Sequence, residues 1–98
     1  MQNYKILCGN NQMVWLEIQP KDEKKFLMWA KSLGCVWSNG EEINPQKSVG
    51  FIHFSICGDG KLGIVPIFAW VSEQTKLKNV RRCICKFTQE TYAQIDDY

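Results

Sequence analysis

The chain has 98 residues and a formal net charge of +2, and 45% of its residues are hydrophobic, 22% charged and 12% aromatic. This length predicts one domain spanning residues 1–98, because natural domains mostly contain about 50 to 250 residues. The apolar content excludes a disordered chain, the charge balance excludes a strongly acidic nucleic-acid mimic, and no apolar run reaches the roughly 20 residues of a membrane span.

The first elements predicted along the chain are two strands joined by a turn. Residues 3–8 are rich in β-prone side chains, and residues 9–12 (Gly-Asn-Asn-Gln) indicate a turn because Gly and Asn tolerate positive φ. Residues 13–19 then alternate between two faces. We therefore expect a hairpin with one face in the core.

A single amphipathic helix is predicted over residues 20–33. Pro20 suits the first helical turn, where its missing N–H costs nothing, and Gly34 suits the left-handed residue that ends a helix. Apolar side chains recur at helical spacing on Phe26, Trp29, Ala30 and Leu33.

Short strands and turns are predicted after this helix. Residues 35–37 favour a strand, Asn39-Gly40 is typical of a two-residue hairpin turn, and residues 41–43 would be the return strand. Residues 51–57 predict another strand. It leads through Asp59-Gly60 into a long strand over residues 61–71.

The last predicted strand covers residues 80–88, and an acidic tail over residues 89–98 is expected to be mobile. Pro66 indicates a bulge or an unpaired position within the preceding strand. The sum is an α+β fold, in which one helix packs on one face of an antiparallel sheet of five or six strands.

The cysteines indicate a reducing compartment. They are odd in number, contain no CxxC pair and lie in or beside apolar stretches, at Cys8, Cys35, Cys57, Cys83 and Cys85. Zinc is not predicted, because only Cys83 and Cys85 are close together and His53 is the sole histidine. Residues 1–11 lack a charged head followed by an apolar stretch, so a cytoplasmic protein without a signal peptide is expected.

Positive charge is concentrated near the C-terminal end. Residues 76–86 hold five basic and no acidic residues, whereas the other 87 residues carry a net charge of −3. Such a segment could bind phosphates or an acidic protein surface, and its candidate partner-binding residues are Lys76, Lys78, Arg81, Arg82 and Lys86. The alternative is a solvated strand whose charges protect a sheet edge.

No residue set predicts catalysis. His53, Ser55 and Cys57 share a face of one strand, but neighbours two apart lie about 7 Å from each other and no acidic partner is adjacent in sequence. Residues 58–61 (Gly-Asp-Gly-Lys) lack the spacing of a phosphate-binding loop and lead into a strand. The sequence therefore predicts neither an enzyme nor a cofactor.

Trp37 stands beside a polar turn and is a candidate anchor for a partner. A tryptophan bordered by polar groups suits recognition of a protein or of a stacked base. The candidate surface comprises Trp37, Asn39, Glu41 and Glu42. The alternative is that Trp37 packs against the end of the helix.

One stretch of 20 residues, 26–45, resembles a recurrent pattern. A helix ends at Gly, a Trp follows, and an Asn-Gly turn precedes a polar strand. The residues that carry it are Phe26, Trp29, Gly34, Trp37, Asn39, Gly40, Glu41, Ile43 and Pro45. The pattern is similar to that of small accessory proteins of bacteriophages and other mobile elements.

The resemblance implies a function in defeating host defences. Short non-catalytic proteins of this kind inhibit a bacterial defence protein, such as an immune nuclease, by steric contact, as anti-CRISPR proteins do. The alternative is a protein that sequesters a nucleotide signal in a pocket, formed at a symmetric dimer interface. The chain is expected to be a monomer or a homodimer. Sequence-nonspecific nucleic-acid binding is less well supported, because the net charge is close to zero.

Overall fold

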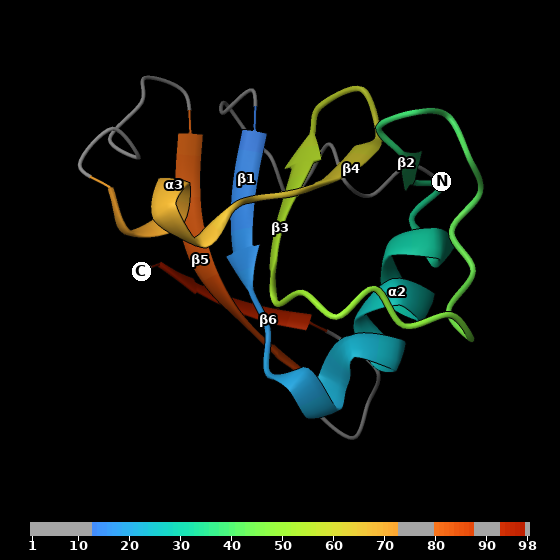
Figure 1. The fold of residues 1–98 in the computed structure, drawn as a ribbon, viewed down its shortest axis with the longest axis horizontal. Helices are drawn as coiled ribbons and strands as arrows, with labels where there is room; N and C mark the ends of the chain where they lie inside the picture. Colours follow the sequence, from blue (N-terminus) through green and yellow to red (C-terminus); the bar gives the residue numbers. More distant parts are fainter. Residues whose placement is uncertain (1–12, 73–79, 88–92, 98) are drawn as a thin grey trace.

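The computed structural model describes residues 13–72, 80–87 and 93–97 of the chain. Its centre is a six-stranded sheet with the strand order β2-β4-β3-β1-β5-β6 (Figure 1). The predicted α+β class is confirmed. The strands are β1 (Met13–Glu17), β2 (Val36–Trp37), β3 (His53–Cys57), β4 (Lys61–Ile64), β5 (Val80–Phe87) and β6 (Ala93–Asp97).

The sheet is mixed, so the prediction of a purely antiparallel sheet was wrong. β1 runs parallel to β5 and β2 runs parallel to β4, while the other neighbouring strands are antiparallel. The alternation of side chains reveals a strand but not its direction. Met13 pairs with Val80, and a partner so distant in sequence leaves no turn signal between the two.

β1 lies in the interior of the sheet and is buried on both faces. Val14 and Leu16 are fully buried on one face and Trp15 is buried on the other. Because β3 and β5 flank β1, neither of its edges is left for the predicted hairpin partner. That partner, residues 3–8, lies outside the described residues.

The predicted helix forms in two parts, a short 3-10 turn η1 (Pro20–Asp22) and the helix α2 (Glu23–Ser32). The backbone N–H of Asp22 donates to the carbonyl of Gln19 at 2.9 Å, which closes the tighter first turn. Gly34 adopts a φ of 88° just after the helix, as predicted.

The buried face of α2 covers one face of the sheet. Its Phe26, Leu27 and Ala30 are fully buried and belong to the larger hydrophobic core. This core also contains Val14 and Leu16 of β1 and the side chains that β3 directs to the same face. Burial of an apolar face supplies most of the stability of such a helix.

The predicted hairpin over residues 35–43 was wrong in its return strand. Residues 41–43 form no strand, and β2 pairs instead with β4. Ile43 is fully buried in the larger core, so the chain turns inward there. The Asn39-Gly40 turn survives locally, because the N–H of Gly40 donates to the carbonyl of Trp37 at 2.8 Å.

The predicted strand over residues 51–57 is shorter than expected, because β3 begins at His53. The turn after it forms as predicted. Gly60 has a φ of 87°, and its N–H donates to the carbonyl of Cys57 at 3.0 Å. β4 then pairs antiparallel with β3.

A second helix, α3 (Ile67–Val71), replaces the second half of the predicted strand over residues 61–71. Pro66 is the N-cap residue, and its carbonyl accepts hydrogen bonds from the N–H groups of Ala69 and Trp70, each at 3.0 Å. Proline has no N–H to give to a sheet, so the strand ends before it. The prediction of one helix was therefore wrong.

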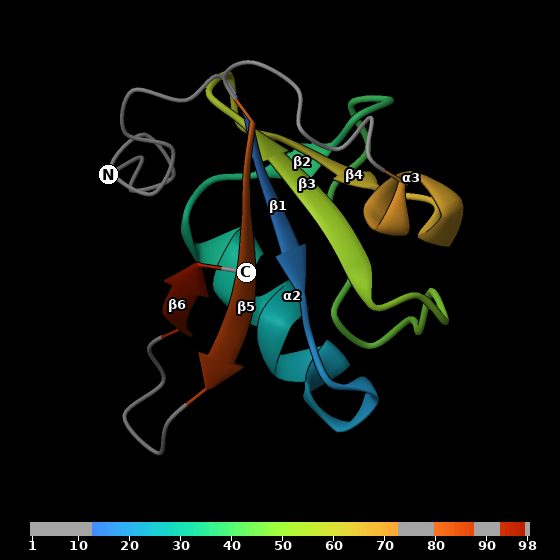
Figure 2. The ribbon, with the colours of Figure 1, turned by 90° about the vertical axis from the view of Figure 1, so that its left-hand side faces the viewer.

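α3 lies against the opposite face of the sheet from α2 (Figure 2). A smaller hydrophobic cluster fills the space beneath it, built from Trp15 of β1, Val65 and Trp70. The two faces of β1 thus belong to two separate clusters.

Residues 93–97 of the predicted acidic tail form the strand β6, which was not predicted. β6 pairs antiparallel with β5 along residues 83–87. β5 therefore lies between β1 and β6 over residues 83–87, whereas β6 does not extend to Arg81 and Arg82, so the interpretation of these basic residues as protection of a sheet edge stays a prediction.

Candidate functional site

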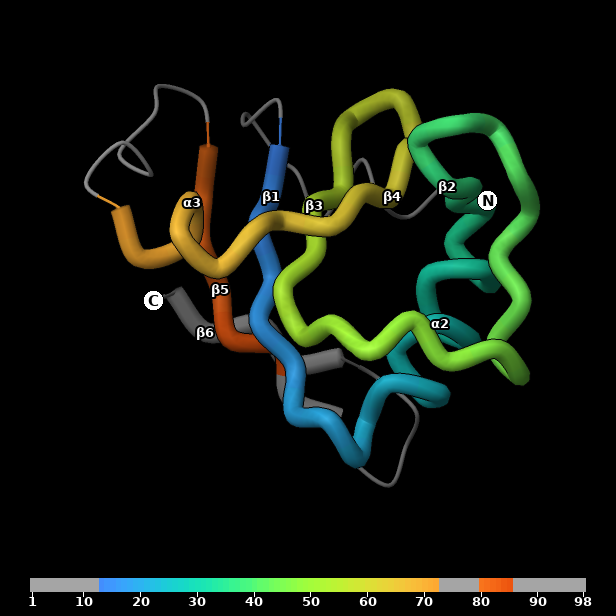
Figure 3. Tube along the Cα trace, viewed as in Figure 1, coloured from blue at the N-terminus to red at the C-terminus, as the bar shows by residue number. Residues whose placement is uncertain are grey.

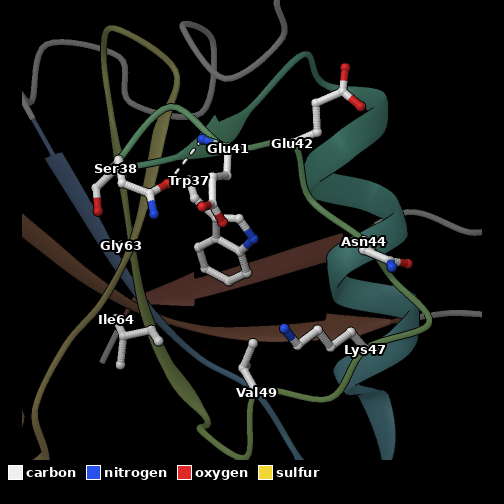
Figure 4. Close-up of a pocket in the computed structure, with 10 residues that line it drawn as sticks. Trp37, Ser38, Glu41, Glu42, Asn44, Lys47, Val49, Gly63 and Ile64 are labelled. Carbon is white, nitrogen blue, oxygen red and sulfur yellow. Dashed lines mark hydrogen bonds between the residues drawn. The ribbon is translucent and has the colours of Figure 1, made fainter.

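A hollow of about 670 Å³ opens beside Trp37, at the edge of the sheet where β2 ends (Figure 4). The residues that line it come from β2, from the loop that follows it, and from β4. They are Trp37, Ser38, Asn39, Glu41, Glu42, Asn44, Lys47, Val49, Gly63 and Ile64. The structure thus brings together the four residues predicted as a partner surface around the Asn39-Gly40 turn.

Trp37 is half-buried, and it both packs on the core and lines the hollow. Its ring centroid lies 6.5 Å from that of Phe54, with the planes tilted by 38°. The backbone on both sides of Trp37 is fixed as well. The N–H of Ser38 donates to the carbonyl of Leu62 at 2.9 Å, and the N–H of Trp37 donates to the carbonyl of Glu41 at 2.9 Å. The indole is therefore held on an ordered support.

The loop that forms the rim runs alongside α2 (Figure 3). Two asparagines order it locally. Asn39 Oδ1 accepts the N–H of Glu41 at 2.9 Å, and Asn44 Oδ1 accepts the N–H of Gln46 at 3.1 Å. The N–H of Gly50 donates to the carboxylate of Glu23 on α2 at 3.0 Å, which ties the end of the loop to the helix. The Asn39 side chain therefore stabilises the turn as well as lining the hollow.

Charged groups of both signs surround the indole. Glu41, Glu42 and Lys47 are exposed, so the hollow carries two carboxylates and one ammonium. Figure 4 shows Lys47 pointing its ammonium towards the Trp37 side of the hollow, and Glu42 pointing away from it. Glu41 lies beside Trp37, because the backbones of these two residues are hydrogen-bonded.

Sequence reasoning missed the residues that complete the hollow from a distance. Lys47 and Val49 belong to the stretch between two predicted strands, where no periodic pattern marks them. Ile64 is an apolar residue of a strand and would be assigned to the core from its type alone. It is 40% exposed because β2 ends before reaching it.

The predicted basic surface is not brought together in the same way. Arg81 pairs in register with Val14 and Arg82 with Trp15, so the two arginines point to opposite faces of the sheet. Lys76 and Lys78 lie outside the described residues. Lys86 belongs to β5, but its side chain lies outside the described part of the chain.

Arg82 has a structural partner in Trp70. Its guanidinium donates to the carbonyl of Trp70 and lies 5.5 Å from the centroid of the Trp70 ring. Such a cation–π contact contributes about 0.5–2 kcal/mol. Arg81 donates from Nε to the Cys83 sulfur at 3.1 Å on the other face. These contacts bind both arginines to the sheet, away from the hollow beside Trp37.

His53 lies on the α3 face and is 4% exposed. Its Nε2 is 2.9 Å from the Glu17 carboxylate, and its ring centroid lies 4.7 Å from that of Trp70. Glu17 is adjacent to His53 only through the β1–β3 register, so sequence spacing could not supply this partner. His53 therefore packs against Trp70 at the edge of the smaller hydrophobic cluster. Among the described residues, no group of three His, Cys, Asp or Glu side chains could hold a metal ion.

Two described thiols are held in their protonated form. Burial raises the pKa of Cys85 to about 12, with further contributions from Cys83 and Asp22. Burial also raises the pKa of Cys57, with a smaller contribution from Asp59. A protonated thiol is a poor nucleophile and a poor metal ligand, which agrees with a structural role for these cysteines.

Stability is expected to depend on Cys85 at alkaline pH. The folded-state pKa of about 12 lies above the ordinary value of 9.0, so the folded chain keeps a proton that the unfolded chain releases. The stability that protonated Cys85 contributes is fully present below about pH 9 and is lost as the pH rises towards 12. In urea unfolding, the wild type should lose about 1 kcal/mol more than Cys85→Ala between about pH 8 and about pH 10. An identical decline in both proteins would contradict this assignment.

None of the described helices has both the length and the apolar character needed to cross a bilayer. The chain was also compared with protein-family models, with curated proteins and with solved structures, and none of the three comparisons found a match.

Proposed function

We propose that this chain is a small non-catalytic binding protein that engages a partner protein through the hollow beside Trp37. The observation that carries the proposal is the grouping of Trp37, Asn39, Glu41 and Glu42 around one hollow. Binding hot spots are enriched in tryptophan and lie in pockets surrounded by polar groups that exclude water. A half-buried indole with a polar rim has that arrangement.

The support of Trp37 adds to the case for binding. Its ring contacts Phe54 and its backbone is hydrogen-bonded to the neighbouring strand and turn. A side chain that is already ordered loses little conformational entropy when a partner binds, so more of the contact energy becomes affinity.

The resemblance of residues 26–45 to accessory proteins of phages and mobile elements gives the proposal its specific form. The partner is then a bacterial defence protein, such as an immune nuclease, and the chain inhibits it by occupying a working surface. This proposal of a defence-protein inhibitor rests on the resemblance and on a surface suited to binding another protein. It assigns no chemical reaction to the chain.

A nucleotide ligand is the second candidate, favoured by one observation. Trp37 could stack on a base while Lys47, which points to the same side of the hollow, pairs with a phosphate. Glu41 and Glu42 line the same hollow, however, and their carboxylates repel phosphate. The charge balance therefore favours a protein partner over a nucleotide.

Replacement of Trp37 by alanine should weaken partner binding about 30- to 1,000-fold, equivalent to about 2–4 kcal/mol. The wild type, Trp37→Ala and Phe68→Ala are immobilised and exposed to a bacterial lysate, and a captured protein is identified by mass spectrometry and titrated. Phe68 is the matched control, because it is an exposed aromatic residue on α3, away from the hollow. Circular dichroism checks that each variant is folded at the assay temperature.

Three results would count against the proposal in different ways. Equal affinity of the wild type and Trp37→Ala would show that the hollow does not bind the partner. A bound species of a few hundred daltons in place of a protein would establish the ligand trap. A loss of affinity in Phe68→Ala equal to that in Trp37→Ala would move the interface to α3.

A further inference from the structure

We propose that the occupant of the hollow is an extended segment of the partner, which pairs its backbone with Ile64 at the open edge of β4. A basic side chain of this segment, arginine or lysine, lies on Trp37 and pairs with Glu41. This inference rests on the proposed function and names the class of partner that the site selects.

The first step is the direction of the backbone groups of Ile64. The N–H of Val65 donates to the carbonyl of His53 at 2.9 Å, and the β3–β4 register pairs Phe54 with Ile64. In an antiparallel ladder, hydrogen-bonded pairs alternate with pairs whose backbone groups point outward. Val65 therefore bonds to β3, and the N–H and C=O of Ile64 point away from it.

The second step is what lies on the outer side of β4. β2 pairs with Lys61 and Leu62 only, and its last bond runs from the N–H of Ser38 to the carbonyl of Leu62. The chain then turns away at Asn39-Gly40. Within the part of the chain that the structure describes, no strand covers Ile64 on this side. An edge of this kind is a template for an added strand.

The third step is that this open edge and the hollow are one place. Gly63 and Ile64 line the same hollow as Trp37, and Figure 4 shows both residues to one side of the indole. A strand laid beyond the end of β2 would therefore carry alternate side chains into the hollow. Recognition by strand addition works in this way, since backbone bonds give affinity and the pocket for alternate side chains gives specificity.

The fourth step is the chemistry of the side chain that enters. The face of a tryptophan ring attracts a cation, and a carboxylate beside it adds a charge-assisted hydrogen bond. Trp37 and Glu41 supply this pair, and Glu42 adds a second negative charge at the rim. Lys47 opposes a basic guest, but the three charged residues together leave the hollow with a net charge of −1. The Glu41 carboxylate beside the indole repels an acidic guest and pairs with a basic one, so a basic guest is selected.

Ile64 offers a partner strand only its two outward backbone groups, so a short peptide is expected to bind weakly. The proposal is therefore tested with peptides by a method that detects weak binding. The probes are the capped pentapeptides Thr-Val-Xaa-Val-Thr, in which Xaa is Arg, Leu or Glu. Their binding is followed by nuclear magnetic resonance, through the amide and indole chemical shifts of the labelled full chain. The Arg peptide should move the Ile64 amide and the Trp37 indole signals, and it should bind at least about 10-fold more tightly than the Glu peptide. Methylation of the peptide's central backbone N–H should weaken it about 10-fold.

Substitutions in the chain give the sharper arm of the test. Glu41→Gln should weaken the Arg peptide about 3- to 10-fold. The matched control is Glu42→Gln, whose carboxylate points away from Trp37 and whose loss should change affinity by less than about twofold. Lys47→Ala should tighten the Arg peptide, because it removes the opposing charge. A phosphate-bearing ligand would respond to Lys47→Ala in the opposite direction.

The possible failures separate the two proposals. Equal binding of the Leu and Arg peptides would overturn the choice of a basic side chain. Absence of shifts at Ile64 and Trp37 with any peptide would overturn strand addition. If a captured partner still depended on Trp37 in that case, the proposed function would stand and the partner would be recognised through a folded surface. A partner that ignored Trp37 would overturn both.

Discussion

Replacement of Trp70 by alanine is expected to lower the free energy of unfolding by about 3–5 kcal/mol. Trp70 is 1% exposed and is the most deeply buried residue of the cluster beneath α3. Its ring centroid lies 6.5 Å from that of Trp15 and 4.7 Å from that of His53, and the guanidinium of Arg82 sits over it. Alanine would leave a cavity beneath a helix of only five residues, which has little else to hold it.

The measurement is urea unfolding followed by far-UV circular dichroism, supported by thermal melts. A loss of about 3 kcal/mol in a domain of this size corresponds to a fall in Tm of at least about 12 °C. Phe68→Ala is the matched control, because Phe68 lies on the same helix but is 72% exposed, and it should change stability by less than about 0.5 kcal/mol. Equal small losses in both variants would show that α3 adds nothing to the stability of the fold.

The helix α3 illustrates why part of the fold could not be predicted from the sequence. Residues 64–71 are rich in β-branched and aromatic side chains, which favour a strand by propensity. The outcome is decided by tertiary contacts. Trp70 is buried against Trp15 and His53, and neither contact is visible until β1 and β3 are placed side by side. The sequence marks Pro66 as an interruption of the strand, but it does not reveal that Pro66 caps a helix.

Local turn chemistry predicts much more of the candidate site. Gly34 and Gly60 adopt the positive φ that their positions indicate, and Asn39 makes the side-chain bond typical of a turn. These signals are enough to place Trp37 next to polar groups from the sequence alone. Lys47 and Ile64 reach the same hollow only because a loop folds back over the edge of the sheet, and sequence periodicity carries no record of that path.

The basic segment shows the opposite case, in which a clear compositional signal does not reveal how the fold places the residues. Arg81 and Arg82 are adjacent in sequence, but a strand directs adjacent side chains to opposite faces. β6 pairs with β5 from Cys83 onward, so among the described residues no strand pairs with Arg81 or Arg82 on the outer side of β5. Charge density along a chain predicts a charged surface only when the fold exposes the charges together.

Replacement of Phe54 by alanine is expected to cost about 3–5 kcal/mol of stability and also to disturb the candidate site. Phe54 is fully buried, with its ring centroid 4.7 Å from that of Phe26 on α2 and 6.5 Å from that of Trp37. Its ring therefore packs against both the helix and the indole that lines the hollow. Removal of its ring takes away a packing partner of α2 and the support of the indole in one change.

Phe54→Leu separates these two effects, because leucine keeps most of the apolar volume but no ring. It should cost less stability than Phe54→Ala in the same urea titration, and the chain should remain folded at about 25 °C. Partner or peptide affinity should nevertheless fall, since Trp37 is no longer held against an aromatic neighbour and must be ordered on binding. Unchanged affinity in Phe54→Leu would show that Trp37 is held by its own strand and turn, and that the core beneath it does not prepare the hollow for binding.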